Sequence, residues 1–385
     1  MKYVYNLDKV KGCIVGGAIG DALGYPVEFM RSTDIHNRFG PQGITRLYLS
    51  QNGIAEFSDD TQMTLFTATG LLAAEAKLNS EGVMDDSFWK ESVKHHLIDW
   101  FCTQNMTRLE KHYSWLYDVE ELQSQRAPGA TCLGALRDLV DGLVRVNNSK
   151  GCGGIMRTAP VALCRGLRES KTPGFMYKLA GELSDITHNH PLGFIPSAML
   201  VMIMNKITHL DTEFDRLALE KVVLSSVLEI GKVEYDNGTS VVTYDKFFGD
   251  VGELCCLILK AVDFAAEDRP DEECITELGK GTTGETALAI ALYCALRHTE
   301  SFEDAVVAAV NHGGDSDSTG AICGNLMGLI HGYGAIPQYF KDDLELLPIL
   351  EEVATDLYTG YTKTEDLNRW KRKYLDGHWP DGSKQ

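Results

Sequence analysis

Two short acidic segments near opposite ends of the chain carry the residues best suited to chemistry. Residues 58–61 read Ser-Asp-Asp-Thr, and residues 315–319 read Asp-Ser-Asp-Ser-Thr, so each segment pairs carboxylates with neighbouring hydroxyls. Hard divalent cations such as Mg2+ and Mn2+ prefer these oxygen ligands to thiolate or imidazole. If the fold brings the segments together, they form a site for one or two such ions. We predict that this metal site is the functional centre.

Each acidic segment also has a purely structural interpretation. Ser58 followed by Asp59 and Asp60 is typical of a helix start, with a hydroxyl N-cap and two carboxylates in the positive first turn. Helix caps are far commoner than metal sites, so either segment alone favours a cap. Each segment holds more acid than a cap requires, however, and the same pattern occurs twice. Together the segments favour a metal site.

Glycine at every fourth position marks two further segments: Gly12, Gly16, Gly20 and Gly24, then Gly320, Gly324, Gly328 and Gly332. This spacing places the glycines in one row on a helix, where each costs about 0.5 to 1 kcal/mol relative to Ala. Close approach of two backbones is the simplest compensation. We predict two central helices, packed against each other or against common neighbours, which hold Asp21 and Glu28 near the second acidic segment. The alternative, a dinucleotide-binding turn at residues 16–20, lacks the GxGxxG spacing and a following βαβ pattern.

The rest of the chain has a helical pattern. With 385 residues and 44% hydrophobic content it can bury a large core. Apolar residues at spacings of three and four predict helices at 63–78, 130–144 and 285–296, and Pro191 and Pro196 flank or start another through 199–204. A small hairpin insertion is possible near 238–249. Because no linker or charge block divides the sequence, we expect an all-α fold, with a single compact multi-helix domain over residues 1–385.

Composition limits the partners and the compartment. The net charge of -19 and the pI near 5.0 argue against a nucleic-acid binder, which needs clustered Lys and Arg. The 10 cysteines form no CxxC pair, which is typical of a reducing compartment, so we expect a cytoplasmic protein. No apolar run looks long enough to span a bilayer, and we expect no membrane association.

Two glycine-rich segments, 149–157 and 279–285, have polar neighbours, and their backbone N–H groups are suited to cradling phosphates. Neither has Walker spacing, and both are also compatible with ordinary loops. The two histidines of residues 187–191 raise the possibility of zinc, but no matching Cys or His pair accompanies them. A polar loop whose histidines hydrogen-bond neighbours or ligand fits better. A GxSxG elbow is absent, so serine hydrolase chemistry has little support.

The order and identity of the motifs resemble the ADP-ribosylglycohydrolases, from about residue 10 to residue 335. The matching segments are Gly-Asp-Ala-Leu-Gly at 20–24 followed by Glu28, Ser-Asp-Asp-Thr at 58–61, Arg-Ala-Pro-Gly at 126–129, Gly-Cys-Gly-Gly through Met-Arg at 151–157, Thr-His at 187–188, and Gly-Gly-Asp-Ser-Asp-Ser at 313–318. Three of these variants look most like the ADP-ribosylarginine hydrolase branch, with the dinitrogenase reductase-activating glycohydrolases as relatives.

That resemblance implies an all-α fold with a binuclear Mg2+ or Mn2+ centre. The implied metal ligands are Ser58, Asp59, Asp60, Asp315, Asp317 and Ser318, with Asp317 bridging the metals; the family often has Thr where Ser58 and Ser318 stand. The implied contacts to ADP-ribose are Ser149, Gly151, Cys152, Gly153, Met156 and His188. Gly279 and Gly281 are added as candidate substrate contacts from the phosphate-cradle argument, although their segment departs from the commoner family pattern.

The implied activity is hydrolytic removal of ADP-ribose from modified protein, with arginine as the first expectation. Asp59 or Asp60 is expected to activate water, and Glu28 to gate the site or contact ribose. The alternatives are a different ADP-ribosyl linkage, such as O-linked serine or a small-molecule conjugate, and a catalytically silent ADP-ribose-binding protein. Intact acidic segments disfavour the silent protein, because it has no chemical reason to keep every ligand.

Overall fold

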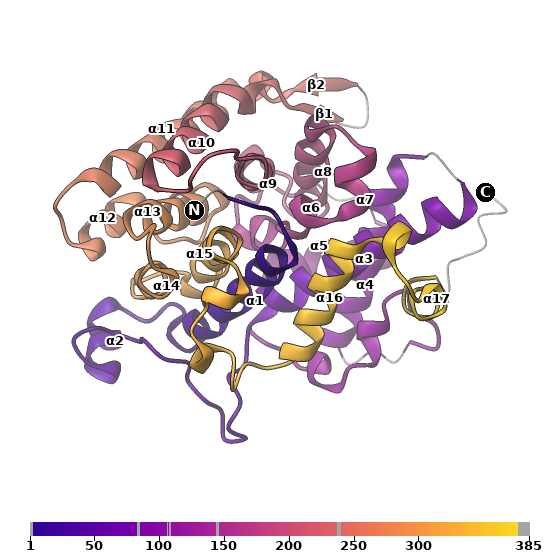
Figure 1. Ribbon diagram of the computed structural model, residues 1–385, viewed down its shortest axis with the longest axis horizontal. Coiled ribbons are helices and arrows are strands. Elements are labelled where there is room, and N and C mark those ends of the chain that lie inside the picture. The colour runs from indigo at the N-terminus through magenta and orange to yellow at the C-terminus, as the bar shows by residue number, and fades with distance from the viewer. Residues whose placement is uncertain are drawn as a thin grey trace.

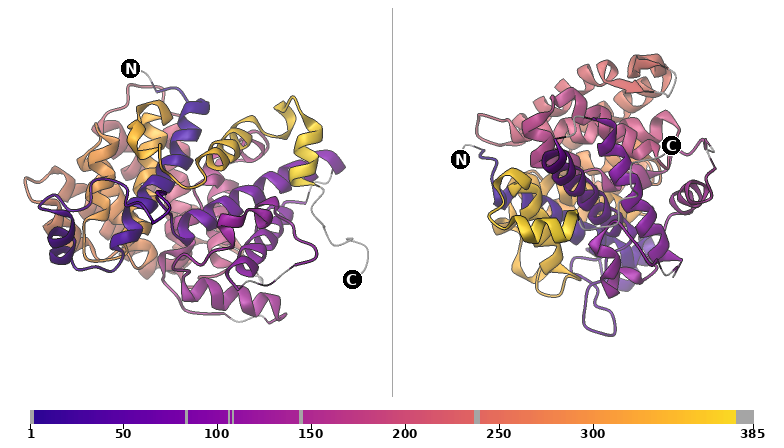
Figure 2. Two further views of the ribbon diagram at one scale, coloured as in Figure 1. Left: turned by 90° about the horizontal axis from the view of Figure 1, so that it is seen from below. Right: turned by 90° about the vertical axis from the view of Figure 1, so that its right-hand side faces the viewer.

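Two glycine-lined helices lie side by side at the centre of the molecule (Figure 1). The structure is a computed structural model that describes residues 3–82, 85–105, 107, 109–143, 146–236 and 240–375. Helix α1 spans Leu7–Gly24 and helix α15 spans Ser316–His331. Figure 2 shows the same neighbourhood from two further sides, with the indigo N-terminal helix against the orange and yellow C-terminal ones. Helices from the N-terminal and the C-terminal parts of the chain therefore meet in the core.

The glycines are the points of contact between α1 and α15. A Cβ atom placed on Gly12 would lie 2.3 Å from the carbonyl oxygen of Gly328, and one on Gly20 would lie 1.9 Å from that of Gly320. Real Cβ atoms do not approach this closely, so only glycine allows the two backbones to touch. The predicted pair of central helices is confirmed. The dinucleotide-binding turn is wrong, because residues 16–20 lie inside α1.

The remaining elements surround this pair. Helices α13, α14 and α16 pack directly on it, and α3 joins it to α4. The helices are α2 Ser32–Phe39, α3 Asp59–Glu81, α4 Ser87–Gln104, α5 Ala130–Val140, α6 Pro160–Leu163, α7 Arg165–Ser170, α8 Pro173–Asp185, α9 Pro191–Thr208, α10 Arg216–Glu229, α11 Phe248–Ala266, α12 Asp271–Leu278, α13 Gly284–Arg297, α14 Phe302–Val310, α16 Leu347–Thr359 and α17 Leu367–Tyr374.

The helices predicted at 63–78, 130–144, 199–204 and 285–296 correspond to α3, α5, α9 and α13. Helix α5 ends earlier than predicted, at Val140, because the chain turns at Gly142, whose φ of 69° is left-handed. Residue 144 lies outside the described residues. Pro191 occupies the first turn of α9, and Pro196 lies inside that helix.

The hairpin exists but begins before the predicted range of 238–249. Strand β1, Glu234–Asp236, pairs antiparallel with β2, Val241–Thr243, and Tyr235 lies opposite Val242. The ring of Tyr235 stacks on that of Phe194 at 4.8 Å, which anchors the first strand to α9. Residues 248 and 249 already belong to α11, and Gly238 lies outside the described residues.

Helix α9 corrects the expectation that no apolar segment is long enough to cross a bilayer. It has 18 residues with a mean hydropathy of 1.3, which meets the length and composition of a membrane span. Yet 89% of this segment is buried by the rest of the protein. The surrounding helices α8, α10, α11 and α13 cover it, so its apolar character is that of a core helix.

The contact between α1 and α15 predicts a difference between two glycine substitutions. Gly20→Ala should lower the free energy of unfolding by at least about 2 kcal/mol, because its Cβ would overlap backbone atoms that have no free space to move into. Gly134→Ala is the matched control, since Gly134 is an exposed residue of α5 and a Cβ added there would meet nothing within 4 Å. It should gain about 0.5 to 1 kcal/mol. Urea unfolding measures both, and equal effects would contradict the close-contact interpretation.

Candidate active site and metal centre

The first acidic segment forms the start of α3 and is fastened there by Asp21 of α1. The Ser58 hydroxyl accepts a hydrogen bond from the Asp60 N–H at 3.2 Å, as an N-cap does. The Asp21 carboxylate accepts from the Ser58 N–H at 2.8 Å, and from the N–H and hydroxyl of Thr61 at 2.9 and 2.5 Å. The cap interpretation is therefore correct for Ser58, while Asp59 and Asp60 remain available for chemistry. Asp21 ties the end of α1 to the start of α3.

The second acidic segment forms the start of α15 and is supported from behind by the 279–284 turn. The Asp315 N–H donates to the Lys280 carbonyl at 2.8 Å. A Cβ on Gly281, whose φ is 74°, would lie 2.7 Å from the Thr319 side chain and 3.0 Å from the Asp315 carbonyl oxygen. Two helix N-termini thus carry the carboxylates, and their positive ends partly offset the negative charge.

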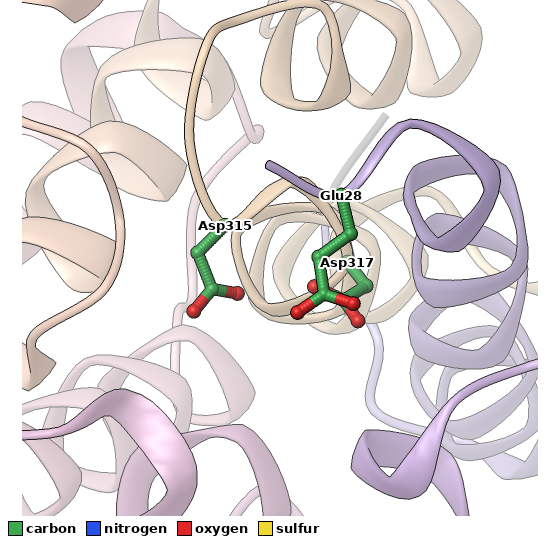
Figure 3. A group of neighbouring side chains, drawn as sticks. All are labelled: Glu28, Asp315 and Asp317. Atoms are coloured by element: carbon green, nitrogen blue, oxygen red, sulfur yellow. The ribbon is translucent and has the colours of Figure 1, made fainter. Parts of the chain in front are cut away.

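Glu28 joins the carboxylates of the second segment. Ligand oxygens of Glu28, Asp315 and Asp317 all lie within 4.8 Å of one another, and Figure 3 shows the side chains gathered around one small space. The backbone after Glu28 is held by Phe29, whose N–H donates to the Gly314 carbonyl at 2.8 Å while its φ is 55°. The structure therefore places Glu28 among the candidate metal ligands.

Both acidic segments open into one cavity of about 360 Å³. None of the described residues that line it is Lys or Arg. Its lining comprises Glu28, Phe29, Asp59, Asp60, Ala127, Pro128, Gly129, Ala130, Thr131, Cys132, Gly151, Cys152, Gly153, Met156, His188, Asp315, Asp317 and Ser318. Residues from opposite ends of the chain, far apart in sequence, thus share one acidic chamber.

Burial changes the acid–base properties of this chamber. It raises the pKa values of Asp59, Asp60 and Asp317 well above their ordinary range. The pKa of Glu28 rises to about 7, first because the group is buried and then because Asp315 and Asp21 repel its charge. Burial also raises the pKa of Asp21 to about 6, against the effect of its hydrogen bonds. Negative charge here is costly without a cation.

These residues fit one or more hard divalent cations. The Oδ2 atom of Asp60 is buried and has no hydrogen-bond partner within the part of the chain that the structure describes. The Ser318 hydroxyl donates to the Cys152 sulfur at 3.5 Å, and the Cys152 thiol donates to Asp315 Oδ2 at 3.1 Å. An unpartnered carboxylate oxygen beside clustered carboxylates and a hydroxyl is the donor set that Mg2+ and Mn2+ prefer.

The predicted site residues divide into three groups. Glu28, Asp59, Asp60, Asp315, Asp317 and Ser318 line the cavity, as do Gly151, Cys152, Gly153, Met156 and His188. Ser58 and Ser149 lie behind the wall: the Ser149 hydroxyl accepts from the Gly151 N–H at 3.2 Å, and Ser58 caps α3. Gly279 and Gly281 do not line the cavity, because Gly279 packs on Thr286 and Gly281 under Asp315.

The wall opposite the second segment comes from residues 126–132, for which the sequence suggested a motif but no role. The Arg126 carbonyl accepts from the Asp59 N–H at 2.9 Å, and the Gly129 N–H donates to Asp59 Oδ2 at 3.2 Å. The Arg126 guanidinium is held by Glu56 at 3.2 Å and Glu345 at 3.1 Å. Ala127 has a φ of 52°, a left-handed conformation that could not be predicted from an alanine. This loop fixes the position of Asp59.

Comparison with known proteins agrees with this arrangement. The ADP-ribosylglycohydrolase family model matches residues 4–366. The chain belongs to the ADP-ribosylglycohydrolase family. It is 25% identical to the ADP-ribosylarginine hydrolase Tri1 of Serratia proteamaculans over 92% of this chain and 80% of that protein. It is 24% identical to the ADP-ribosylhydrolase ARH3 of Danio rerio over 93% of this chain and 92% of that protein.

A solved structure shares the family's fold. The chain aligns with an ADP-ribosylglycohydrolase-related protein complex at a TM-score of 0.57 and 21% identity, over 91% of this chain and 97% of that one. Members of the ADP-ribosylglycohydrolase family are hydrolytic enzymes that act on ADP-ribose and depend on divalent metals, and the acidic chamber described above is where this chain could hold one.

Substitution of Asp60 should separate stability from metal binding. In EDTA, Asp60→Asn should be at least as stable as the wild type, because it removes a buried acid that lacks a partner. In Mn2+ at about 100 times its Kd, the wild type should gain about 2.7 kcal/mol and the variant much less. Chemical unfolding with and without Mn2+ measures this. The exposed Asp263 provides the control, Asp263→Asn, which should follow the wild type. A wild type indifferent to Mn2+ would contradict the metal site.

Glu28 predicts a pH dependence of the metal-free protein. Its pKa in the folded state, about 7, lies above its ordinary value of 4.5, so folding favours the protonated form. The stabilisation should be full below about pH 4.5 and lost as the pH rises to about 7. Relative to Glu28→Gln, wild-type stability in EDTA should decline across this window and then level off. Saturating Mn2+ should reverse the trend, because the metal needs the carboxylate. A difference independent of pH would refute this interpretation.

Proposed function

We propose that this protein is a metal-dependent hydrolase that removes ADP-ribose from arginine in modified proteins. The observation that carries the proposal is the single cavity in which carboxylates from both chain ends converge without a lysine or arginine among its described lining residues. Family membership supports a reaction on an ADP-ribosyl group. The acidic lining of the cavity supports arginine as the acceptor from which ADP-ribose is removed.

Arginine fits this electrostatic environment better than a neutral acceptor does. A substituted guanidinium is a cation. With two divalent ions bound, the five carboxylates among the described lining residues would still leave one net negative charge, which attracts a cation. A serine acceptor is uncharged, so the negative potential of the cavity does not attract it in this way. The relative from Serratia proteamaculans, whose name specifies ADP-ribosylarginine, supports the same choice. The motif variants at 126–129, 151–154 and 315–318 point in that direction as well.

The residues that would hold two Mg2+ or Mn2+ ions are Ser58, Asp59, Asp60, Asp315, Asp317 and Ser318, together with Glu28. When bound, such ions supply Lewis acidity, which lowers the pKa of water and orients ribose hydroxyls. In the reaction, the oxygen of water bonds to C1 of the ribose as the bond from C1 to the acceptor nitrogen breaks. The nitrogen leaves with a proton.

The protein's own contribution is electrostatic and acid–base. The transition state of glycoside hydrolysis carries positive charge on the ribose, and the fixed carboxylates around the cavity stabilise that charge. Asp59 or Asp60 would accept the proton of the attacking water. Burial raises the pKa of both groups in the metal-free protein, and bound cations would lower it again.

Release of ADP-ribose from arginine-linked, serine-linked and small-molecule conjugates tests the proposal. The wild type with Mg2+ or Mn2+ should act on the arginine conjugate, and EDTA should abolish turnover. Asp60→Asn should lower kcat by at least about 100-fold, whereas Asp263→Asn should not change it. Preference for the serine or small-molecule conjugate would overturn the acceptor assignment, and full activity in EDTA would overturn the metal-dependent mechanism.

A further inference from the structure

Three glycines clear a space for the imidazole of His188 at the cavity wall. A Cβ on Gly151 would lie 3.0 Å from Nε2 of His188, and one on Gly153 would lie 3.0 Å from Cε1. A Cβ on Gly193 would lie 3.0 Å from the His188 Cβ atom. These distances are shorter than ordinary carbon contacts. The glycine-rich segment that suggested a phosphate cradle is thus also a seat for this ring, which is only 2% exposed.

The inner nitrogen of the ring belongs to a buried chain of hydrogen bonds. Nδ1 of His188 lies 2.8 Å from the hydroxyl of Thr187. That hydroxyl also accepts a hydrogen bond from Nη2 of Arg157 at 2.8 Å. A guanidinium can only donate, so the direction of this second bond is fixed. Arg157 is fully buried, and it also donates to the carbonyls of Gly153 at 2.6 Å and Leu183 at 3.1 Å, which hold it in place.

The Thr187 hydroxyl has one proton and two possible acceptors. Nδ1 of His188 lies at 2.8 Å, and the Ser184 carbonyl lies at 3.4 Å, which is long for a bond from a hydroxyl. The Ser184 carbonyl already accepts from the N–H groups of Thr187 and His188, at 3.1 and 3.0 Å. Its two lone pairs are therefore used. The hydroxyl proton points to Nδ1.

An acceptor at Nδ1 places the single proton of a neutral imidazole on Nε2. The ring is neutral, since burial and then the charge of Arg157 lower its pKa to about 3. Among the hydrogen bonds of the described residues, none involves Nε2, and His188 is part of the cavity lining. The outer edge of the ring is therefore an N–H donor without a partner among the described residues.

We propose that Arg157 and Thr187 are positioning residues that hold His188 in its Nε2–H form, so that the ring donates a hydrogen bond to an oxygen of the ADP-ribosyl group. The identity of that ligand rests on the proposed function, whereas the position of the proton does not. His188 then serves recognition, because a nitrogen that already carries a proton cannot take one from water. Proton transfer is left to the carboxylates.

The position of the proton is measured by long-range 1H–15N NMR of the 15N-labelled wild type at neutral pH. The His188 signals are those lost in His188→Gln. Nε2 should show the shift of a protonated nitrogen and Nδ1 that of an unprotonated one. Thr187→Ser, which keeps the hydroxyl, should give the same pattern, and the isosteric Thr187→Val should give a mixture of both forms. A wild type with the proton on Nδ1, or with an even mixture, would overturn the proposal without need of any variant.

The ligand is tested by titration calorimetry with free ADP-ribose. Thr187→Val should bind about three- to tenfold more weakly than Thr187→Ser, which is the range expected for one neutral hydrogen bond. Equal affinities in these two variants, together with different NMR patterns, would overturn the recognition role of His188. A wild type that does not bind ADP-ribose would overturn the proposed function and the ligand assignment together, whereas the NMR pattern would still decide the tautomer.

Discussion

The contact between the backbones of α1 and α15 is the constraint on which the rest of the structure depends. Glycine faces glycine along both helices, and no other residue fits at these positions. Because the helices run in opposite directions, the last turn of α1 meets the first turn of α15. Asp21 and Glu28 are thereby brought to the second acidic segment, and Asp21 in turn fixes the start of α3. This close contact therefore brings together the two acidic segments that line the cavity.

The cavity is costly for the fold in the absence of a cation. Its carboxylates are buried, they repel one another, and one oxygen of Asp60 has no partner among the described residues. These carboxylates stay close together despite their repulsion. They are held by the helix N-termini, by the hydrogen bonds to Asp21 and by the loop at 126–129. Function and stability are in tension here, as is common where a site is built before its ligand arrives. The glycine contact and the large apolar core supply the stability that the cavity lacks.

The features that could be predicted from the sequence are those in which residue spacing alone determines the arrangement. A glycine at every fourth position implies a close helix contact, and paired aspartates beside hydroxyls imply an oxygen site. Other parts depend on tertiary packing. Gly281 supports Asp315 from behind because of how its turn folds, and Ala127 adopts a left-handed φ with no signal in its residue type. Length and hydropathy alone could not distinguish the core helix α9 from a membrane span.

The cavity needs residues from both the N-terminal and the C-terminal parts of the chain, so it can form only after both parts have been synthesised. When α1 and α3 have left the ribosome, the first acidic segment is present. The glycines of α15, against which α1 packs, have not yet been synthesised. Until the chain beyond residue 315 emerges, the glycine row of α1 lacks the helix that it packs against. Asp59 and Asp60 likewise lack Asp315 and Asp317 as neighbours. Contacts of such long sequence separation form late and slowly. The nascent protein therefore lacks its complete cavity until the residues of α15 have been synthesised.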